Sequence, residues 1–540
     1  MNGLMMTGSL LISSILKHAA RFNADVEIVS RKTEGGIHRY TFSDAAKRSC
    51  QLANALKRLG VEKGDRIATL GWNNFRHLEI YYAVSGSGAI CHTINPRLFM
   101  EQIAYIIGHA EDKWVFVDIT FVPMLEKLAD QLSSVQGYVI MTDRKHMPDT
   151  SLENVLCFEE LIVNEASHFE WPELDEKTAS SLCYTSGTTG NPKGVLYSHR
   201  STILHAYASC MKDTLGLSCM DVVMPVVPMF HVNAWGIPYS ALMTGSKLVL
   251  PGSDMDGASL YQMINDEGVT VTAGVPTIWS GLLAYLEKNN LNLNDLQRVI
   301  VGGSACPEVM ITTFSERYNV DTTHAWGMTE TSPIGTVNTM TTATLALSAP
   351  ERLAIKAKQG RPVFGVDIKI VDDDLNELPR NGRAFGHLKI CGPWVCSEYY
   401  KSDSQDGHEE QGWFSTGDVA TIDENSYMKI TDRSKDVIKS GGEWISSIDI
   451  ENVAVAHPNV IEAAVISKPD ERWGERPVLF LVTKAASELS EQEILNFCAG
   501  KIAKWSMPDE VVFINELPHT ATGKILKMKL REDYMEKHYG

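Results

Sequence analysis

The sequence predicts a mixed α/β fold with a large N-terminal domain and a small C-terminal α+β domain. Between residues 41 and 320, helix-like stretches alternate with short apolar runs, which is typical of sheets covered by helices on both faces. After residue 361, short β-rich runs are separated by Asp, Asn and Gly turns, which indicates a small antiparallel unit completing the large domain. Helix and strand patterns mix again after residue 435. We therefore expect domains over residues 1–434 and 435–540, the second mobile.

The expected elements follow from local hydrophobic periodicity. In the first region we expect helices at 43–59, 261–267 and 277–286, and strands at 66–70, 114–117 and 298–301. The antiparallel unit is expected to use strands at 366–371, 387–390 and 428–430. In the C-terminal domain the patterns predict helices at 447–457 and 491–495 and strands at 463–467 and 477–482.

Composition narrows the classes of function. The formal net charge of -18, from 67 acidic and 49 basic residues, argues against nucleic-acid partners and against general attraction to anionic membranes. The apolar run at residues 10–16 follows no basic residue and is too short to span a bilayer, so we expect an amphipathic helix and no integral membrane segment. The 10 cysteines form no Cys-x-x-Cys pair, which favours reduced thiols in a cytoplasmic protein.

Residues 184–194, Tyr-Thr-Ser-Gly-Thr-Thr-Gly-Asn-Pro-Lys-Gly, carry the clearest chemical signal. Glycines let the backbone approach a ligand closely, and hydroxyl and amide groups can donate to phosphate oxygens while Lys193 supplies charge. A Walker A loop is excluded because Gly194, and not Ser or Thr, follows the lysine. The segment predicts a phosphate-binding loop that includes Thr185, Ser186, Gly187, Thr188 and Thr189.

This loop resembles the signature of the adenylate-forming superfamily, which includes acyl-CoA synthetases, adenylation domains and luciferases. The superfamily's other motifs follow in order, so the resemblance covers the chain from about Ile12 to the C-terminus. Segments 227–238, 301–305 and 440–447 are most similar to bacterial fatty-acyl-CoA synthetases and 3-methylmercaptopropionate-CoA ligases. The resemblance implies ATP, Mg²⁺ and coenzyme A as cofactors.

The nucleotide site is implied by two further motifs. Residues 325–331, Ala-Trp-Gly-Met-Thr-Glu-Thr, resemble the adenine motif, in which Glu330 with Thr185 would hold Mg²⁺. Residues 415–418, Ser-Thr-Gly-Asp, resemble the ribose site, where Asp418 and Arg433 would contact the sugar. The implied nucleotide-binding set is Ser186, Gly187, Thr188, Thr189, His231, Gly303, Trp326, Gly327, Met328, Thr329, Asp418, Arg433 and Lys439.

The C-terminal motifs imply the catalytic lysine and the CoA contacts. Segment 435–445 resembles the family's hinge and thiolation segment, with Lys435 as the hinge. The implied CoA-binding residues are Gly441, Gly442, Glu443 and Trp444, although a strand followed by a tight Gly-Gly turn would explain the same pattern. Segment 518–525 resembles the last motif of the family, which makes Lys524 the first choice for the catalytic residue, together with Lys193.

The acyl site is expected around residues 228–236. No Asp, Glu, Lys or Arg occurs from 222 to 246, so a pocket built from this segment favours an uncharged acyl tail. Amino acids are poor candidates, because Phe230-His231 replaces the Asp typical of amino-acid-activating domains. Trp235 either limits the pocket, is a movable gate for a long chain, or is an ordinary core aromatic. The predicted acyl-site residues are His231, Trp235, Gly302 and Pro333.

These residues predict an acyl-CoA ligase that forms an acyl-adenylate from a carboxylic acid and ATP, then transfers the acyl group to CoA with release of AMP. A short- or medium-chain acid such as 3-methylmercaptopropionate is favoured over a long-chain fatty acid. Three alternatives are a long-chain fatty-acyl-CoA synthetase, a stand-alone enzyme that loads a carrier protein, and a non-catalytic nucleotide-binding protein. A homodimer is a family-level expectation only.

Overall fold

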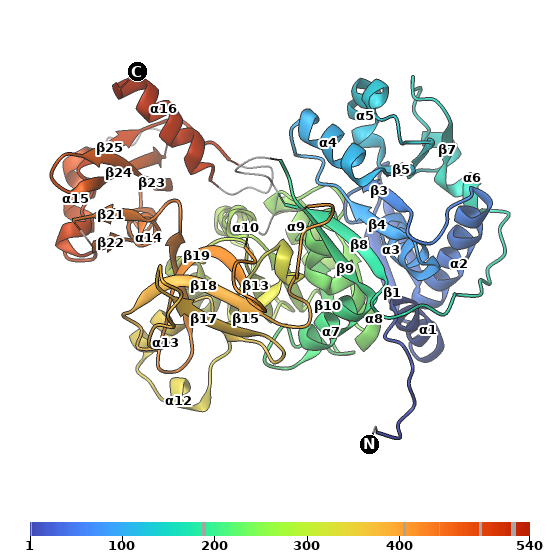
Figure 1. Ribbon diagram of the computed structural model, residues 1–540, viewed down its shortest axis with the longest axis horizontal. Coiled ribbons are helices and arrows are strands. Elements are labelled where there is room, and N and C mark those ends of the chain that lie inside the picture. The colour runs from blue at the N-terminus through green and yellow to red at the C-terminus, as the bar shows by residue number, and fades with distance from the viewer. Residues whose placement is uncertain are drawn as a thin grey trace.

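The computed structural model describes residues 1, 3–185, 191–402, 407–441, 443–484, 489–519 and 525–539. Two large sheets and a smaller antiparallel sheet make up the body of the molecule, and a fourth sheet with its helices lies to one side (Figure 1). The predicted fold class, a large N-terminal domain with a small C-terminal domain, is confirmed.

The first large sheet has seven strands, and its strands are parallel except for the edge pair β8 and β9. Their order is β7 (Val155–Cys157), β6 (Gly137–Ile140), β5 (Trp114–Val117), β3 (Arg66–Leu70), β4 (Ile90–Thr93), β8 (Ala179–Tyr184) and β9 (Gly194–Ser198). The inner strands are buried on both faces and read as apolar runs because helices cover both sides.

The second large sheet has nine strands, with a parallel centre and antiparallel edges. Their order is β16 (Arg361–Pro362), β15 (Ile334–Val337), β14 (Asp321–Gly327), β13 (Arg298–Val301), β12 (Val271–Gly274), β10 (Val222–Pro225), β11 (Lys247–Leu250), β1 (Glu27–Arg31) and β2 (Ile37–Thr41).

Helices cover these sheets, and α3 is packed between them. Twelve of the 13 residues of α3 are buried, and it contacts β4 and β8 of the first sheet and β1 of the second. Its buried polar residues Arg76 and Glu79 form ion pairs with neighbouring charged side chains. The helices of the body are α1 (Ile12–Phe22), α2 (Phe42–Arg58), α3 (Phe75–Ser87), α4 (Met100–Ala110), α5 (Val122–Leu128), α6 (Phe158–Ile162), α7 (His199–Cys210), α8 (Ile237–Thr244), α9 (Gly257–Glu267), α10 (Pro276–Asn289), α11 (Glu308–Thr312), α12 (Thr342–Leu345) and α13 (Ala349–Lys356).

Short helical turns link these elements. They are η1 (Ile119–Phe121), η2 (Ala129–Gln131), η3 (Arg144–His146), η4 (Val232–Gly236), η5 (Thr313–Arg317) and η6 (Thr329–Thr331), with η7 (Lys504–Ser506) in the C-terminal domain.

The predicted small antiparallel unit is present as a four-stranded sheet. It consists of β17 (Asp367–Val371), β18 (Phe385–Cys391), β19 (Phe414–Ile422) and β20 (Met428–Arg433), paired in that order. Asp418 and Arg433 are directly opposite each other on β19 and β20. This register brings the two residues predicted to contact ribose to one place.

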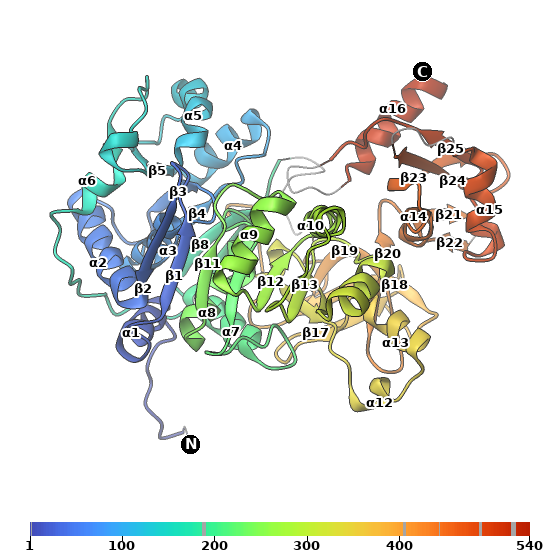
Figure 2. The ribbon, with the colours of Figure 1, turned by 180° about the vertical axis from the view of Figure 1, so that it is seen from behind.

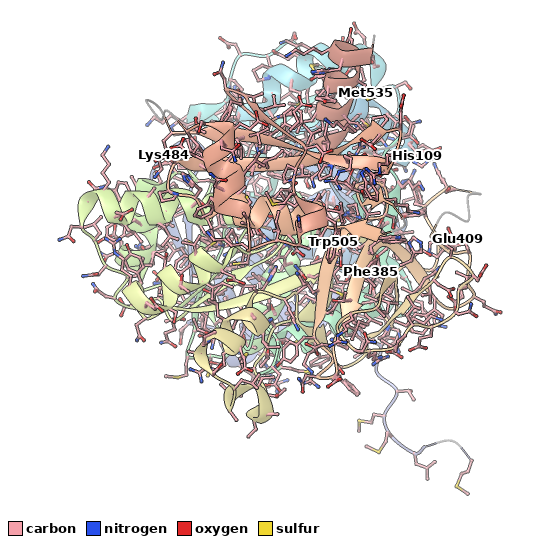
Figure 3. The ribbon with its side chains drawn as sticks, turned by 90° about the vertical axis from the view of Figure 1, so that its left-hand side faces the viewer. His109, Phe385, Glu409, Lys484, Trp505 and Met535 are labelled. Carbon is pink, nitrogen blue, oxygen red and sulfur yellow. The ribbon has the colours of Figure 1, made fainter. Side chains whose placement is uncertain are left out.

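The C-terminal domain has its own sheet and its own buried cores. Its elements are β21 (Ile438–Ser440), β22 (Glu443–Ile445), α14 (Ser447–Val455), β23 (Val460–Asp470), β24 (Gly474–Thr483), α15 (Glu491–Cys498), β25 (Glu510–Phe513) and α16 (Lys527–Tyr539). Figure 2 shows this domain set apart from the body, and Figure 3 looks onto it, with Lys484, Trp505 and Met535 labelled.

A few direct contacts join the C-terminal domain to the small antiparallel sheet. The Ser446 hydroxyl donates to the Thr431 carbonyl at 2.6 Å, and the Ser447 N–H donates to the Asp432 carboxylate at 2.8 Å. The rings of Trp444 and Phe385 are 5.2 Å apart. The contacts therefore lie close to the residues where the chain passes from one domain to the other.

The predicted elements are all present, with small differences at their ends. Helix α9 begins at Gly257, earlier than the hydrophobic pattern indicated, because the Asp256 carboxylate caps it by accepting from the N–H groups of Ala258 and Ser259. The expected N-terminal amphipathic helix is α1, and the 10 cysteines are free thiols. Within the described ranges, no helix combines the length and apolar character needed to cross a membrane.

Candidate active site

The predicted site residues gather where parallel strands of the two large sheets end. Thr185 follows β8 in the first sheet, and Gly302 follows β13 in the second. In open α/β sheets, ligands bind outside the carboxyl ends of the strands. By this rule, the substrates are expected beside these two strand ends.

The β8–β9 hairpin closes the base of the predicted phosphate-binding loop. The Thr185 N–H donates to the Lys193 carbonyl at 2.9 Å, and the Lys193 N–H donates to the Thr185 hydroxyl oxygen at 3.1 Å. Antiparallel pairing of Tyr184 with Gly194 continues this closure. The predicted residues Ser186, Gly187, Thr188 and Thr189 lie outside the described residues.

A buried carboxylate lies beside this hairpin. Glu330, in η6, is only 5% exposed, and its Oε1 accepts a hydrogen bond from the Tyr399 hydroxyl at 2.8 Å. The Lys193 ammonium lies 4.9 Å from the centre of the Tyr399 ring, so one tyrosine contacts both predicted groups. Desolvation raises the pKa of Glu330, which a nearby cation would oppose. A carboxylate and a threonine hydroxyl are oxygen ligands of the kind that Mg²⁺ prefers.

Three of the predicted nucleotide-site residues form one cluster. The Trp326 indole N–H donates to Asp418 Oδ2 at 3.1 Å, and the Arg433 guanidinium pairs with Asp418 Oδ1 at 3.0 Å. Asp418 is 4% exposed, and its carboxylate raises the pKa of Arg433. Gly327 follows Trp326, and a Cβ there would lie 1.8 Å from the Pro333 carbonyl oxygen. Only glycine fits this position.

The predicted acyl-site residues Trp235 and Gly302 are in contact. Residues 232–235 form a left-handed turn, with a φ of 57° at Trp235. The turn directs the indole against the end of β13, where a Cβ on Gly302 would lie 2.7 Å from Trp235 Cη2. His231 begins this turn, and Gly303 has a φ of +84°. The indole and the glycine pair therefore form a wall at the strand end.

A buried histidine packs next to Trp235 and Pro333. His205, on α7, has a Nε2 that accepts from the Ile334 N–H at 3.2 Å, next to the predicted acyl-site residue Pro333. A Cβ on Gly236, which follows Trp235, would lie 2.8 Å from His205 Nδ1. Burial lowers the pKa of His205 to about 3, so the ring is a neutral acceptor at physiological pH.

The described residues among those predicted for the CoA step lie on or next to the paired strands β21 and β22 of the C-terminal sheet. Gly441 has a φ of +60°, and a Cβ there would lie 2.7 Å from Trp473 Cε3. The Lys439 ammonium, predicted to contact the nucleotide, lies 5.0 Å from the centre of the Trp444 ring. Desolvation lowers the pKa of the predicted hinge residue Lys435. Gly442, the Glu443 side chain and Lys524 lie outside the described residues.

Sequence reasoning missed Tyr399, His205 and Trp473. Tyr399 sits beside Glu330 because Tyr400 bridges to Gly194 of the hairpin, with the Tyr400 N–H donating to the Gly194 carbonyl at 2.8 Å. This pairing joins segments about 200 residues apart, and no local pattern in the sequence signals it. The adjacent residues Tyr399 and Tyr400 are visible in the sequence, but nothing in it indicates their partners.

Comparison with known proteins identifies the family. The profile of the AMP-binding enzymes matches residues 16–400, and that of the AMP-binding enzyme C-terminal domain matches residues 449–524. The chain belongs to the AMP-binding enzyme family. Its fold is that of the adenylate-forming acyl-CoA ligases, and the resemblance seen in the sequence is confirmed.

The relatives and solved structures span the whole chain. A 3-methylmercaptopropionyl-CoA ligase from Ruegeria lacuscaerulensis is 53% identical over 99% of both chains. A medium-chain-fatty-acid–CoA ligase from Ectopseudomonas oleovorans is 51% identical over 99% of this chain and 98% of the relative. The crystal structure of the anthranilate CoA ligase AuaEII with anthranoyl-AMP superposes with a TM-score of 0.88, at 25% identity and 98% coverage of each chain.

Proposed function

We propose that this chain is an AMP-forming acid:CoA ligase that activates an uncharged short- or medium-chain carboxylic acid with ATP and transfers the acyl group to CoA. The observation that carries the proposal is the arrangement of polar groups around the phosphate-loop hairpin. Lys193 and the buried Glu330 share Tyr399 as a contact, and Asp418 is held by an arginine and an indole. Such a site offers charge for phosphates and a carboxylate for ribose.

In the first half-reaction, the substrate carboxylate attacks the α-phosphorus of ATP and pyrophosphate leaves. Lys193 and Lys524 would spread the negative charge that develops on the phosphate oxygens, so the rate would depend on positioning and electrostatics. Asp418 would accept hydrogen bonds from the ribose hydroxyls, with Arg433 beside it. Thr185 and Glu330 would hold Mg²⁺, which would act as a Lewis acid and stabilise negative charge on the phosphate oxygens.

In the second half-reaction, the CoA thiolate attacks the acyl carbonyl carbon and AMP leaves. Gly441 and Gly442 would let the pantetheine arm pass close to the backbone, with Glu443 and Trp444 beside it. Because Lys524 and this glycine pair cannot both serve one site at once, residues 435–540 would rotate about Lys435 against residues 1–434 between the steps. The desolvated Lys435 lies where the two domains meet.

The contact between Trp235 and Gly302 favours a short or medium chain, because the indole occupies the space beyond the strand end. The segment around it carries no charge from 222 to 246, which suits an apolar tail. The two relatives described above are named for acids of this kind, so 3-methylmercaptopropionate is a candidate substrate. We also propose a cytoplasmic location and a homodimer on family grounds.

A pyrophosphate-release assay with a panel of acids tests this function. Release should require both an acid and ATP, and a thioester should form only when CoA is added. Acid-dependent release that proceeds to a carrier protein but not to CoA would indicate a loading enzyme. A folded protein that releases no pyrophosphate with any acid would contradict the proposal and favour a non-catalytic nucleotide-binding protein.

A further inference from the structure

The turn that carries Trp235 has a backbone conformation that L-amino acids rarely adopt. Val232, Asn233, Ala234 and Trp235 have φ angles of 48°, 49°, 49° and 57°. Such a run of non-glycine residues in the left-handed region is unusual, and a β-branched residue such as Val232 is the least suited to it. A conformation of this kind persists only where the surrounding contacts hold it. The contacts that hold this turn therefore decide where the Trp235 indole lies.

The Asn233 side chain provides two of these contacts. Asn233 is buried, its Nδ2 donates to Ser181 Oγ at 3.0 Å, and its Oδ1 accepts from the Cys183 thiol at 3.6 Å. Burial raises the pKa of Cys183 to about 11, so the thiol keeps its proton and stays a donor at physiological pH. Both ends of the Asn233 amide are therefore held by hydrogen bonds.

Both partners of Asn233 lie on the strand that leads into the predicted phosphate-binding loop. Ser181 and Cys183 are two residues apart on β8, so they share one face of the strand, and Thr185 follows its last residue. The Thr93 hydroxyl, on the neighbouring strand β4, lies 3.3 Å from Cys183 Sγ. Asn233 is thus anchored to paired, buried strands of the first large sheet.

The backbone just before the turn is also fixed by the first sheet. Asn73, which follows β3, is fully buried. Its Nδ2 donates to the Pro225 and Val227 carbonyls at 2.8 and 2.9 Å, and its Oδ1 accepts from the Met229 N–H at 2.6 Å. Helix α8 begins directly after the turn. The turn is therefore held at both ends, and Asn233 holds it in the middle.

The turn spans the two large sheets. Asn233 contacts β8 of the first sheet, whereas the Trp235 indole contacts Gly302 at the end of β13 in the second. These two residues are separated by one position in the chain, so a change in the backbone at Asn233 reaches the indole directly. The position of the acyl-site wall consequently depends on a residue that faces away from it.

We propose that Asn233 is a positioning residue that determines acyl chain length, because its hydrogen bonds to β8 hold the left-handed turn and keep the Trp235 indole against Gly302. The inference rests on the proposed function, since it concerns the acyl site of that ligase. Without the amide, the turn can relax toward ordinary backbone angles and the indole is no longer fixed at the end of β13. Longer acids then fit, and short acids lose contacts.

Binding of unreactive acyl-adenylate analogues tests the proposal without turnover. Acyl sulfamoyl adenosines with straight acyl chains of increasing length are titrated by calorimetry into the wild-type protein, Asn233→Gly and Ser181→Ala. Glycine adopts a φ of 49° without steric cost, so Asn233→Gly removes the anchor and adds no backbone strain. We expect the affinity ratio of longer to shorter chains to rise, by up to about fourfold for each methylene group that the displaced indole admits.

A matched control and a double variant isolate the hydrogen bond. Asn290→Gly is the control, because Asn290 is exposed and has a φ of 51° at the end of α10. If Asn233 and Ser181 act through one hydrogen bond, combining Asn233→Gly with Ser181→Ala shifts the chain-length profile no further than Asn233→Gly alone. In steady-state assays, KM for short acids should rise while KM for ATP stays at the wild-type value. A general loss of stability would instead lower activity equally with every acid.

An unchanged chain-length profile in folded Asn233→Gly would overturn the proposal. Should that variant fail to fold, an unchanged profile in Ser181→Ala decides the question in the same way, because this change leaves the backbone of the turn as it is. Failure of the ligase assignment has a different signature, since the wild-type protein would then bind none of the analogues.

Discussion

Removal of the Trp235 indole should shift the preferred acid toward longer chains. The ring occupies the space next to Gly302, where an added Cβ would lie only 2.7 Å from Trp235 Cη2. Trp235→Gly would empty this space and would also relieve a φ of 57°, a left-handed conformation that costs an L-residue roughly 1–2 kcal/mol. Two further methylene groups buried there would gain about 1.6 kcal/mol, or about fifteenfold in kcat/KM.

The assay compares kcat/KM for straight-chain acids and 3-methylmercaptopropionate in the wild-type protein and in Trp235→Gly. Short acids should lose affinity while longer acids gain it. Gly302→Ala provides the matched change on the other side of this contact, because its Cβ would force the Trp235 indole to move. Trp505→Gly, an exposed tryptophan of the C-terminal domain, is the control. An unchanged chain-length profile would refute the reasoning, and altered rates without a shifted optimum would identify Trp235 as a gate to a long tunnel.

Three other predictions test separate parts of the molecule. Lys524→Ala should slow adenylate formation much more than thioester formation from a supplied acyl-adenylate, and equal losses in both half-reactions would exclude a first-step role. Gly441→Leu should leave acid-dependent pyrophosphate exchange largely intact and slow CoA-dependent turnover, since a side chain there would obstruct the proposed pantetheine path; normal CoA turnover in a folded variant would contradict this. His205, with a pKa of about 3 against 6.5 when unfolded, supports stability fully above pH 6.5 and loses it on acidification, about 2 kcal/mol by pH 5. His205→Gln should therefore flatten the fall in thermal midpoint between pH 7 and pH 5, and a parallel fall in both proteins would count against it.

The sequence predicted the fold class well because strand and helix periodicities are local. Hydrophobic runs such as those of β3 and β13 have lengths and flanking turns that mark buried parallel strands, and the structure has them at the expected residues. Hydrophobic periodicity does not define the first residue of a helix. The cap of Asp256 on α9 depends on a side-chain hydrogen bond that hydrophobic periodicity does not report.

Residues of the candidate site could be predicted only where they belong to a recognisable sequence motif. Asp418 and Arg433 were each suggested by a motif, and their pairing across β19 and β20 follows from strand register. Tyr399 and His205 were missed for a different reason. Their importance depends on which distant residues they touch, Glu330 in one case and Ile334 in the other. Such contacts arise from tertiary packing, which single-sequence patterns do not contain.

The hydrogen bonds that join the two domains stand beside the proposed hinge itself. The Asp432 carboxylate accepts from the Ser447 N–H at the start of α14, and the Ser446 hydroxyl donates to the Thr431 carbonyl. Each bond joins residues 15 positions apart that flank Lys435 in the sequence. A rotation centred there moves their partners through short arcs, whereas distant surfaces of the C-terminal domain sweep widely. In the proposed rotation, these bonds would be among the contacts that break, so single substitutions in them should change how long each orientation lasts while leaving both chemical sites untouched.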